Sequence, residues 1–530
     1  MTYQVLVADA ISPSGLAPLT SDARFEVIVH PGLTGEELAR ALAEVHAVVV
    51  RSATHITRDA LRYAERLVLI GRAGVGVDNI DVAAATERGI AVLNAPSGNT
   101  VSAAELAFSL MLSLARRIPA ADHSMHHGEW DKKSFTGSEL LGKTLGLIGA
   151  GRIGGEVARR ARAFGMRVIA YDPYLSPQRA EALEVELTSL AELLAQADVV
   201  SIHTPLTEAT SGLIADAELA QMKRGALLVN AARGGVVDEA ALLRALESGH
   251  LGGAALDVFT EEPLPAEHPL RWAPNLVLTP HLGASTHEAQ QNVAVEIAHA
   301  VRDALLDGDF SHAVNAPAIG REEMRRVRPL ADLAERLGGM AAALLAEPIT
   351  RVSVRYAGPG ENLTRVLGSA AVTGALRPVL GAGSINHVNA LHIAQARGIT
   401  VERADLNARG RYEEFLDVRL ASPDGHEARV AGALVAGRHP RIVRIDRYRL
   451  VIRPAGVLLI VRNRDVPGVI GRVGTALAGA GVNIAEYHQA RLQAGGEALA
   501  AISVDGRVSD DTVAALRSLE DVVSVTQVVL

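Results

Sequence analysis

A glycine-rich turn between an apolar strand and a helix is the feature that most constrains how this chain can fold. Gly149, Gly151 and Gly154 form the pattern G-x-G-x-x-G directly after the apolar run TLGLI. The first glycine permits a tight turn, the second lets backbone approach a pyrophosphate, and the third lets the helix pack on the strand. The free N–H groups of the helix then favour phosphate. The pattern predicts a parallel sheet that binds a dinucleotide.

An acidic residue follows this turn at the distance that such a site requires. Asp172 ends the apolar run RVIAYD, about 20 residues after the glycines, where an acid bonds the adenosine ribose hydroxyls. A carboxylate there would repel a 2′-phosphate, so it favours NAD over NADP. The alternative is that Asp172 only forms the turn before Pro173.

Short apolar runs alternate with helical stretches over residues 1–285, which predicts an α/β fold with parallel sheets and crossover helices. Helices are expected over 33–45 and 57–65, and a longer one over about 100–118. The first series of expected strands is YQVLVADA, FEVIVH, AVVVR, LVLIGRAG and IAVLNAP. The second series is TLGLIGAG, RVIAYDP, DVVSIHTP, GALLVNAA, GGAALDVF and NLVLTP, apolar on both faces as in a covered sheet.

An amphipathic helix over 287–308 is expected to return to the first series of strands. Residues 1–99 and 286–316 would then form a discontinuous, flavodoxin-like substrate-binding domain. Residues 100–285 would form a Rossmann-type, doubly wound NAD-binding domain.

The pattern changes after residue 316. A linker over 317–328 is expected to run into a helix, followed by strands at ITRVSVRYAG and within 429–453 that surround a helical segment, LGAGSINHVNALHIAQARG. Residues 317–454 are therefore predicted to be a separate α+β domain. Residues 455–530 show the order strand-helix-strand-strand-helix-strand, which is ferredoxin-like.

Composition narrows the class of protein. A net charge of −8 argues against a general nucleic-acid binder, which needs a basic face. Because the chain has no cysteine, disulfides and thiolate metal sites are excluded, and no metal site is expected. We see no secretory pattern at the amino terminus and no apolar run of the ~18–20 residues that a membrane span needs. These features favour a cytoplasmic enzyme or regulator that does not contact membranes.

Three segments after the glycine-rich turn each offer a catalytic group: NAARGGVVDE with Arg233, DVFTEEPL with Glu262, and TPHLGAST with His281. His281 follows a strand end, where α/β sheets bind ligands, and an imidazole exchanges a proton near pH ~6.5. Glu262 could orient it, and Arg233 could hold a carboxylate and polarise a carbonyl. Alone, each could be a loop histidine, a solvated acid or a surface ion-pair member. Together they favour hydride transfer at a carbon that bears oxygen.

These segments, with GRAGVGVDNID at 71–81, NAPSGNTVSAAE at 94–105 and HTPLT at 203–207, resemble the D-isomer-specific 2-hydroxyacid dehydrogenases over essentially the whole chain. The resemblance implies NAD as cofactor, His281 as acid/base, Glu262 as its partner and Arg233 as a catalytic, substrate-binding cation. It places Asp257 at the nicotinamide carboxamide, and Arg152 and Ile153 at the pyrophosphate. The implied cofactor-binding residues are Val75, Gly149, Gly151, Arg152, Ile153, Gly154, Asp172, Thr204, Ala231, Ala232, Arg233, Asp257, His281, Gly283 and Ala284.

Two features favour a phosphorylated substrate. Arg51 and Ser52 end the strand AVVV with a cation and a hydroxyl suited to phosphate, and Arg72 precedes a turn whose N–H groups could hold a carboxylate. Lys132 and Lys133 could add charge across a subunit boundary. Alternatively, Arg51 and the two lysines are simply solvated. The expected substrate-binding residues are Arg51, Ser52, Arg72, Ala73, Gly74, Val75, Asn99, Arg233 and His281.

The C-terminal half resembles the long members of this family. RDVPGVIGRVGTALAGAGVNIAEY is similar to an ACT domain, and SINHVNALHIAQARGI to an intervening domain. The resemblance implies oxidation of 3-phospho-D-glycerate (3-phosphoglycerate) to 3-phosphohydroxypyruvate, the first step of phosphorylated L-serine biosynthesis, by a homotetramer that L-serine regulates. Asn463, Asp465 and Asn483 match serine-binding positions, with Asn463 where some relatives have tyrosine. Alternatively, the ACT domain only assembles subunits.

Two other functions remain open from the sequence. One is a dehydrogenase of another small D-2-hydroxy acid, which would tolerate Arg51→Ala. The other is an NAD-sensing regulatory protein that keeps the dehydrogenase fold without turnover.

Overall fold

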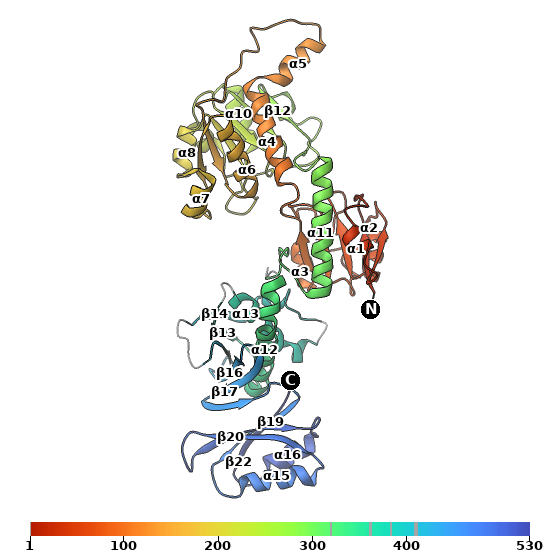
Figure 1. Ribbon diagram of the computed structural model, residues 1–530, viewed down its shortest axis with the longest axis vertical. Coiled ribbons are helices and arrows are strands. Elements are labelled where there is room, and N and C mark those ends of the chain that lie inside the picture. Colours follow the sequence, from red (N-terminus) through yellow and green to blue (C-terminus); the bar gives the residue numbers. More distant parts are fainter. Residues whose placement is uncertain (1, 318–320, 360–362, 382–383, 407–411) are drawn as a thin grey trace.

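The computed structural model describes residues 2–317, 321–359, 363–381, 384–406 and 412–530. Their strands form sheets of five, seven, six and four strands, which follow one another along an elongated molecule (Figure 1). The seven-stranded sheet lies at one end and the four-stranded sheet at the other. None of the helices in these residues is both long and apolar enough to cross a membrane.

The five-stranded sheet is parallel, with the order β2-β1-β3-β4-β5, which confirms the flavodoxin-like topology. Its strands are β1 (Tyr3–Val7), β2 (Phe25–Val29), β3 (Ala47–Val50), β4 (Leu69–Arg72) and β5 (Ala91–Asn94). The helices near it in sequence are α1 (Ala17–Thr20), α2 (Gly35–Glu44) and α3 (Val82–Glu87).

Helix α11 (His287–Asp307) returns to this sheet from far along the chain. Its buried Ile297 and Val301 lie in one cluster with strand residues of β1 and β5. A Cβ at Gly71 on β4 would lie only 2.8 Å from a Val301 methyl, so glycine lets the helix approach the sheet closely. The amphipathic pattern therefore buries its apolar face against the sheet, as the sequence predicts.

The seven-stranded sheet is also parallel, with the Rossmann-type order β12-β11-β10-β9-β6-β7-β8. Its strands are β6 (Thr144–Ile148), β7 (Arg167–Tyr171), β8 (Glu186–Leu187), β9 (Val199–Ile202), β10 (Leu227–Asn230), β11 (Gly253–Leu256) and β12 (Leu276–Leu278). Its helices are α4 (Thr100–Ala115), α6 (Arg152–Ala163), α7 (Pro177–Leu183), α8 (Leu190–Gln196), α9 (Asp216–Gln221) and α10 (Glu239–Glu247), with a 3-10 turn, η1 (Pro269–Trp272).

Two expected helices differ from the structure. The segment 57–65 forms turns, because i→i+3 bonds such as Arg62 N–H to Asp59 O interrupt the α-helical pattern. The helix expected over 100–118 ends at Ala115, since Arg117 adopts a left-handed conformation with φ of 52° before a second helix, α5 (Ile118–His126).

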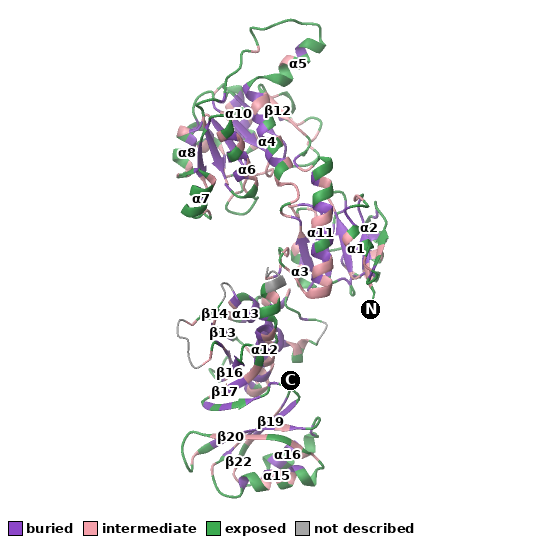
Figure 2. Cartoon of the chain, in the orientation of Figure 1, coloured by how far each residue is buried: buried purple, intermediate pink, exposed green. Residues whose placement is uncertain are grey.

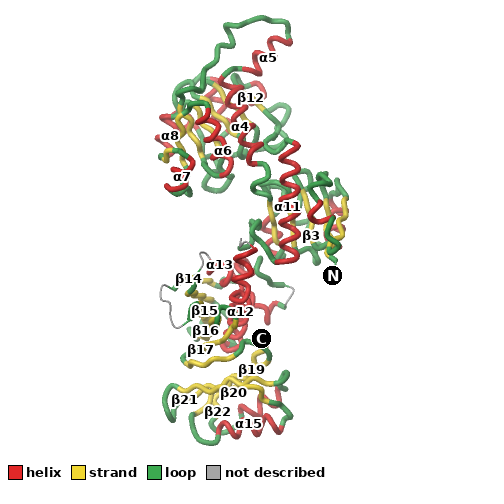
Figure 3. The backbone as a smooth tube through the Cα atoms, viewed as in Figure 1, coloured by secondary structure: helices red, strands yellow, loops and turns green. Residues whose placement is uncertain are grey.

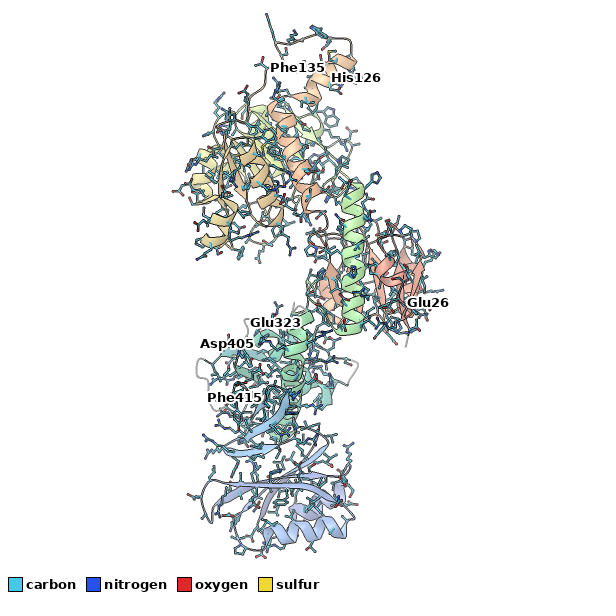
Figure 4. All side chains as sticks on the ribbon, viewed as in Figure 1. Glu26, His126, Phe135, Glu323, Asp405 and Phe415 are labelled. Atoms are coloured by element: carbon cyan, nitrogen blue, oxygen red, sulfur yellow. The ribbon has the colours of Figure 1, made fainter. Side chains whose placement is uncertain are left out.

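Helix α5 and the loop after it form an arm that projects from the molecule and is largely exposed (Figure 2). His126 and Phe135 lie on the projecting part of this arm, at the end of the molecule that carries the seven-stranded sheet (Figure 4). Lys132 and Lys133 belong to the loop of this arm.

The six-stranded sheet has the order β14-β13-β15-β16-β17-β18, and α12 (Arg321–Leu345) and α13 (Leu363–Leu380) pack together against it. Residues 382 and 383 of the Gly/Asn-rich segment lie outside the described residues. Its described part contains the last residue of α13 and the helix α14 (Ala390–Ala396), with a loop from Ser384 to Asn389 before α14. The sequence did not predict β14, β15 or α13. The strands are β13 (Arg351–Ala357), β14 (Thr400–Asp405), β15 (Glu414–Ala421), β16 (Glu427–Val435), β17 (His439–Ile445) and β18 (Tyr448–Ile452).

The loop before α14 contacts the first sheet's domain at the end of α3. Asn386 Nδ2 donates to Gly89 O at 2.9 Å, and Asn389 Nδ2 lies 3.5 Å from Glu87 O. Two asparagine amides therefore meet backbone carbonyls at the carboxyl end of α3, one in its last turn and one just beyond it.

The four-stranded sheet is antiparallel, with the ferredoxin-like order β20-β21-β19-β22 and both of its helices on one face (Figure 3). Its elements are β19 (Val457–Arg464), α15 (Val469–Gly479), β20 (Ile484–Arg491), β21 (Glu497–Val504), α16 (Asp510–Arg517) and β22 (Val522–Val529), and the predicted order of strands and helices is confirmed.

Candidate active site

A cavity of about 580 Å³ lies between the five-stranded and seven-stranded sheets. The chain passes from one domain to the other twice beside it, at Asn99 before α4 and at Ser285 before α11, and both residues line the cavity. Loops that follow the carboxyl ends of β4, β9, β10 and β11 also line it, as expected for ligand sites of parallel sheets.

His281 and Glu262 form a hydrogen-bonded pair on the cavity wall. His281 Nδ1 lies 2.7 Å from Glu262 Oε2, and Glu262 Oε1 accepts the Phe259 N–H at 3.0 Å. Because a carboxylate can only accept, Nδ1 carries the proton and Nε2 is left as the basic atom. The bond to Glu262 raises the pKa of His281, although burial opposes it. Burial also opposes the charge of Glu262, but the bond from His281 holds its pKa below the usual value.

The backbone of His281 is held in a left-handed conformation, with φ of 54°. Such a conformation costs about 1–2 kcal/mol in a residue other than glycine, so other bonds must stabilise it. The His281 N–H donates to Asp257 O at 2.9 Å, and the Asp257 carboxylate accepts the next two N–H groups, of Leu282 at 2.7 Å and Gly283 at 3.0 Å. Burial raises the pKa of Asp257. Asp257 therefore fixes the loop that carries the imidazole.

Arg233 lies in the turn after β10 and lines the same cavity. Asn230 shapes this turn, since its Nδ2 donates to Arg233 O at 2.9 Å and its Oδ1 accepts the Ala232 N–H at 3.1 Å. The Arg233 guanidinium crosses the junction, with Nε 3.4 Å from Asp78 Oδ2 in the first sheet's domain.

Two further arginines from the five-stranded sheet line the same cavity. Arg51 follows β3, and its N–H donates to Asp9 Oδ2 at 2.5 Å. Arg72 ends β4, and its buried Nε has no partner among the described residues. Burial, then the charge of Arg233, lowers the pKa of Arg72 to about 10. Three carboxylates also line the cavity, but Glu262 bonds to His281 and Asp257 bonds to loop N–H groups, so the arginines are left to pair with an anion.

The glycine-rich turn has the geometry that a pyrophosphate requires. Gly149 has φ of 90°, and a Cβ at Gly154 would lie 2.2 Å from Gly149 O. At Gly151, which precedes the first turn of α6, no atom lies within 4 Å of the position of a Cβ, so bare backbone faces open space. Asp172 Oδ2 accepts the Ala150 N–H at 3.0 Å, and Oδ1 accepts the Tyr174 N–H at 2.9 Å. Asp172 thus supports this turn and also forms the turn around Pro173.

The cavity brings together most of the residues that the sequence analysis singled out. Gly74 lies between lining residues, where a Cβ would meet Arg72 Nη1 at 1.5 Å. Gly149, Gly151, Arg152, Gly154 and Asp172 lie outside the lining, at the glycine-rich turn, and the lysines of the arm do not line it. The expected residues that line it are Arg51, Ser52, Arg72, Ala73, Val75, Asn99, Ile153, Thr204, Ala231, Ala232, Arg233, Asp257, Glu262, His281, Gly283 and Ala284.

The lining residues that were not expected as site residues are Gly76, Asp78, Ala103, His203, Pro205, Pro280, Ser285 and Val293. Asp78 belongs to the segment GRAGVGVDNID, which the sequence analysis singled out. Its ion pair with Arg233 could not be predicted, because the two residues are far apart in sequence. His203 belongs to HTPLT, and burial lowers its pKa to about 4, so it is neutral at ordinary pH.

The three residues matched to an effector site lie in the four-stranded domain. Asn463 is 1% exposed, and its Oδ1 has no partner among the described residues. Asp465 accepts bonds from Arg491 Nη1 at 2.9 Å and from the Gly495 N–H at 3.2 Å, which hold its pKa below the usual value. Asn483 Nδ2 donates to Asp505 Oδ2 at 2.7 Å. Within the described residues, Asn463 is buried, Asp465 pairs with Arg491 and Asn483 bonds to Asp505, so no hydrogen bond is described that joins the three to one another.

Comparison with family models matches three parts of the chain. Residues 108–283 match the NAD-binding domain of D-isomer-specific 2-hydroxyacid dehydrogenases, residues 326–446 the D-3-phosphoglycerate dehydrogenase intervening domain, and residues 457–521 the ACT domain. Fold and site together define an NAD-dependent oxidoreductase of the 2-hydroxyacid dehydrogenase class.

Full-length relatives place the chain more closely. It is 40% identical to a D-3-phosphoglycerate dehydrogenase of Bacillus subtilis, over 99% of each chain. It is 42% identical to one of Archaeoglobus fulgidus, over 99% of this chain and all of that one. An NAD-dependent formate dehydrogenase of Staphylococcus aureus, solved with NAD, aligns with 58% of this chain and 96% of its own (33% identity, TM-score 0.51). The chain therefore belongs to the D-3-phosphoglycerate dehydrogenase family.

Proposed function

We propose that this chain oxidises 3-phospho-D-glycerate to 3-phosphohydroxypyruvate. The observation that carries the proposal is the convergence of Arg51, Arg72 and Arg233 on a cavity that also holds the His281–Glu262 pair. A substrate with a carboxylate at one end and a phosphate at the other matches this charge distribution. An unphosphorylated acid would leave part of it without a counter-charge.

In this proposal Arg233 binds the substrate carboxylate and polarises the oxygen on C2. His281 Nε2 accepts the hydroxyl proton, and Glu262 stabilises the resulting imidazolium. When bound, NAD supplies the acceptor for the hydride that leaves C2. The bare backbone at Gly151 and the first turn of α6 would hold its pyrophosphate, and Asp172 its adenosine ribose. Arg51 and Ser52 would hold the substrate phosphate.

We also propose the domain division 1–99 with 286–316, 100–285, 317–454 and 455–530. The return of α11 to the five-stranded sheet supports the discontinuous first domain. A cytoplasmic location, a homotetramer and regulation by L-serine through the ACT domain stay predictions. An amino-acid effector would fit a module of this type, with Asp465 able to pair with its ammonium group.

The test is the production of NADH from 3-phosphoglycerate and NAD, with the keto product trapped, and D-lactate and D-glycerate as control substrates. Turnover confined to the phosphorylated acid, lost on Arg51→Ala, is expected. Turnover of an unphosphorylated acid alone would contradict the substrate assignment. Specific NAD binding without turnover of any acid would point to a regulatory protein. Repeating the assay with L-serine tests the effector.

A further inference from the structure

Asp78 places a carboxylate among the cavity's arginines. It lies in the segment between β4 and α3, and its Oδ2 is 3.4 Å from Arg233 Nε across the junction of the two domains. Both residues line the cavity. The Asp78 side chain is 72% exposed, whereas that of Arg233 is 26% exposed. The carboxylate is therefore the partner that can move into solvent, and the more buried guanidinium would then need a new anion as its partner.

The ion pair between Asp78 and Arg233 packs directly against the backbone of Gly76. A Cβ at Gly76 would lie 2.1 Å from Arg233 Nη2 and 2.6 Å from Asp78 Oδ2. The guanidinium and the carboxylate thus occupy the space that a side chain at position 76 would take. Glycine at this position lets both groups reach the substrate-binding loop at the same time.

The other carboxylates that line the described part of the cavity are engaged elsewhere. Glu262 bonds to His281, and Asp257 bonds to the loop at Leu282 and Gly283. Asp78 is the carboxylate that faces the arginines, and its charge also favours the protonated form of the buried Arg72. It stands where a carboxylate ligand of Arg233 would bind.

We infer that Asp78 is a resident counter-ion of Arg233, which the substrate's carboxylate must displace, and that Asp78 thereby sets the affinity for substrate. The assignment of the ligand as a 3-phosphoglycerate carboxylate rests on the proposed function. The displacement itself requires only a carboxylate that binds Arg233. The counter-ion weakens binding, because each ligand must replace an existing ion pair and approach a like charge.

The experiment compares the full-length chain with Asp78→Asn, using oxalate as the probe in the presence of NADH, by calorimetry. Removal of a solvent-screened charge beside the ligand is expected to tighten oxalate binding about three- to tenfold. The KM for 3-phosphoglycerate should fall by a similar factor, while kcat stays within about twofold. Asp78→Ser provides a second variant that also lacks the charge.

Asp59→Asn is the matched control. Asp59 pairs with Arg62 in the same domain, outside the cavity, and its side chain is 74% exposed, close to the value for Asp78. This variant should leave oxalate binding and KM unchanged.

Weaker oxalate binding or a higher KM in Asp78→Asn would show that Asp78 positions Arg233 for substrate, and would overturn the inference. Unchanged binding would overturn it as well, because Asp78 would then be a spectator. A wild-type chain that binds oxalate but does not oxidise 3-phosphoglycerate would refute the proposed function. In that case oxalate binding still tests the role of Asp78.

Discussion

The first sheet's domain makes two junctions, and the hydrogen-bonded or ion-paired groups described at them differ in kind. Toward the seven-stranded sheet, charged side chains such as Asp78 and Arg233 meet across a cavity at 3.4 Å. Toward the six-stranded sheet, the Asn386 amide meets the Gly89 carbonyl at 2.9 Å. Charged pairs respond to ligands, salt and pH, whereas amide–carbonyl bonds do not titrate. One junction is therefore suited to change with its ligand, and the other to stay closed.

The junction at Asn386 and Gly89, which we call the neutral junction, is tightly packed. Gly89 has φ of 72°, and a Cβ there would lie 2.4 Å from Asn386 Nδ2. The Asn386 Oδ1 also accepts the Val388 N–H at 2.9 Å, so the amide is fixed from both ends. A change at this junction should alter stability, and a change at the cavity should alter activity.

The largest effect is expected at the charged junction, from His281→Asn. Loss of the proton acceptor should lower kcat about 10²- to 10⁴-fold, because general acid–base catalysis contributes that much. Affinity for NADH should fall far less than kcat, because the other residues implied to bind the cofactor are unchanged. Steady-state rates and fluorescence titration with NADH check this. Retention of more than a tenth of the wild-type kcat would mean that another group accepts the proton.

A smaller loss, about ten- to hundredfold, is expected from Glu262→Gln, because the imidazole remains. In the wild type, kcat/KM for oxidation should rise with pH through the raised pKa of His281, since the neutral imidazole is the base. The rate of keto-acid reduction should fall over the same pH range. Without the carboxylate, both inflections should move to lower pH. If the inflections did not move, a group other than His281 would be responsible for the pH dependence.

Gly76→Ala should raise KM about tenfold while the fold is retained. The added Cβ would meet the flexible tips of Arg233 and Asp78 rather than backbone. Displacement of the guanidinium, which is proposed to bind the substrate, should outweigh any gain from moving the Asp78 carboxylate away. Gly474→Ala in α15 is the control, because no atom lies within 4 Å of its Cβ position. An unchanged KM would show that Arg233 binds substrate from another position.

The smallest effect on activity is expected at the neutral junction, from Asn386→Ala. Loss of its bonds should cost about 1 kcal/mol of stability and increase amide exchange around Gly89, with kcat nearly unchanged. Gln395→Ala on the exposed face of α14 is the control. Hydrogen exchange followed by mass spectrometry checks both variants. A large loss of kcat in Asn386→Ala would remove the distinction between the two junctions.

Local patterns explain what the sequence could predict. His281, Glu262 and Arg233 each follow a strand whose apolar run is evident, so their approach at one edge of the sheet follows from topology. Asp78 lies in a recognised segment, but its partner Arg233 is distant in sequence, and an acid in a glycine-rich loop resembles a solvated one. The Asn386–Gly89 contact joins residues 297 positions apart, which only packing can bring together.

The same reasoning accounts for the missed elements. Strand β14 is mostly exposed and polar, so it lacks the apolar alternation that indicates a strand. Strand β8 has only two residues. The segment 57–65 has helical composition, but its buried Leu61 packs in the core of the first domain while the backbone forms turns. Tertiary packing here overrides propensity.

The two passages of the chain beside the cavity, at Asn99 and Ser285, have a mechanical consequence. Two bodies joined at two points keep one easy rotation, about the line through those points. The residues at the passages therefore shift little, whereas groups farther from the line sweep through longer arcs. The opening of the cavity can then be described by a single angle. Two spectroscopic probes, one on each side of the cavity mouth, would therefore measure the angle between the two domains that form the active site.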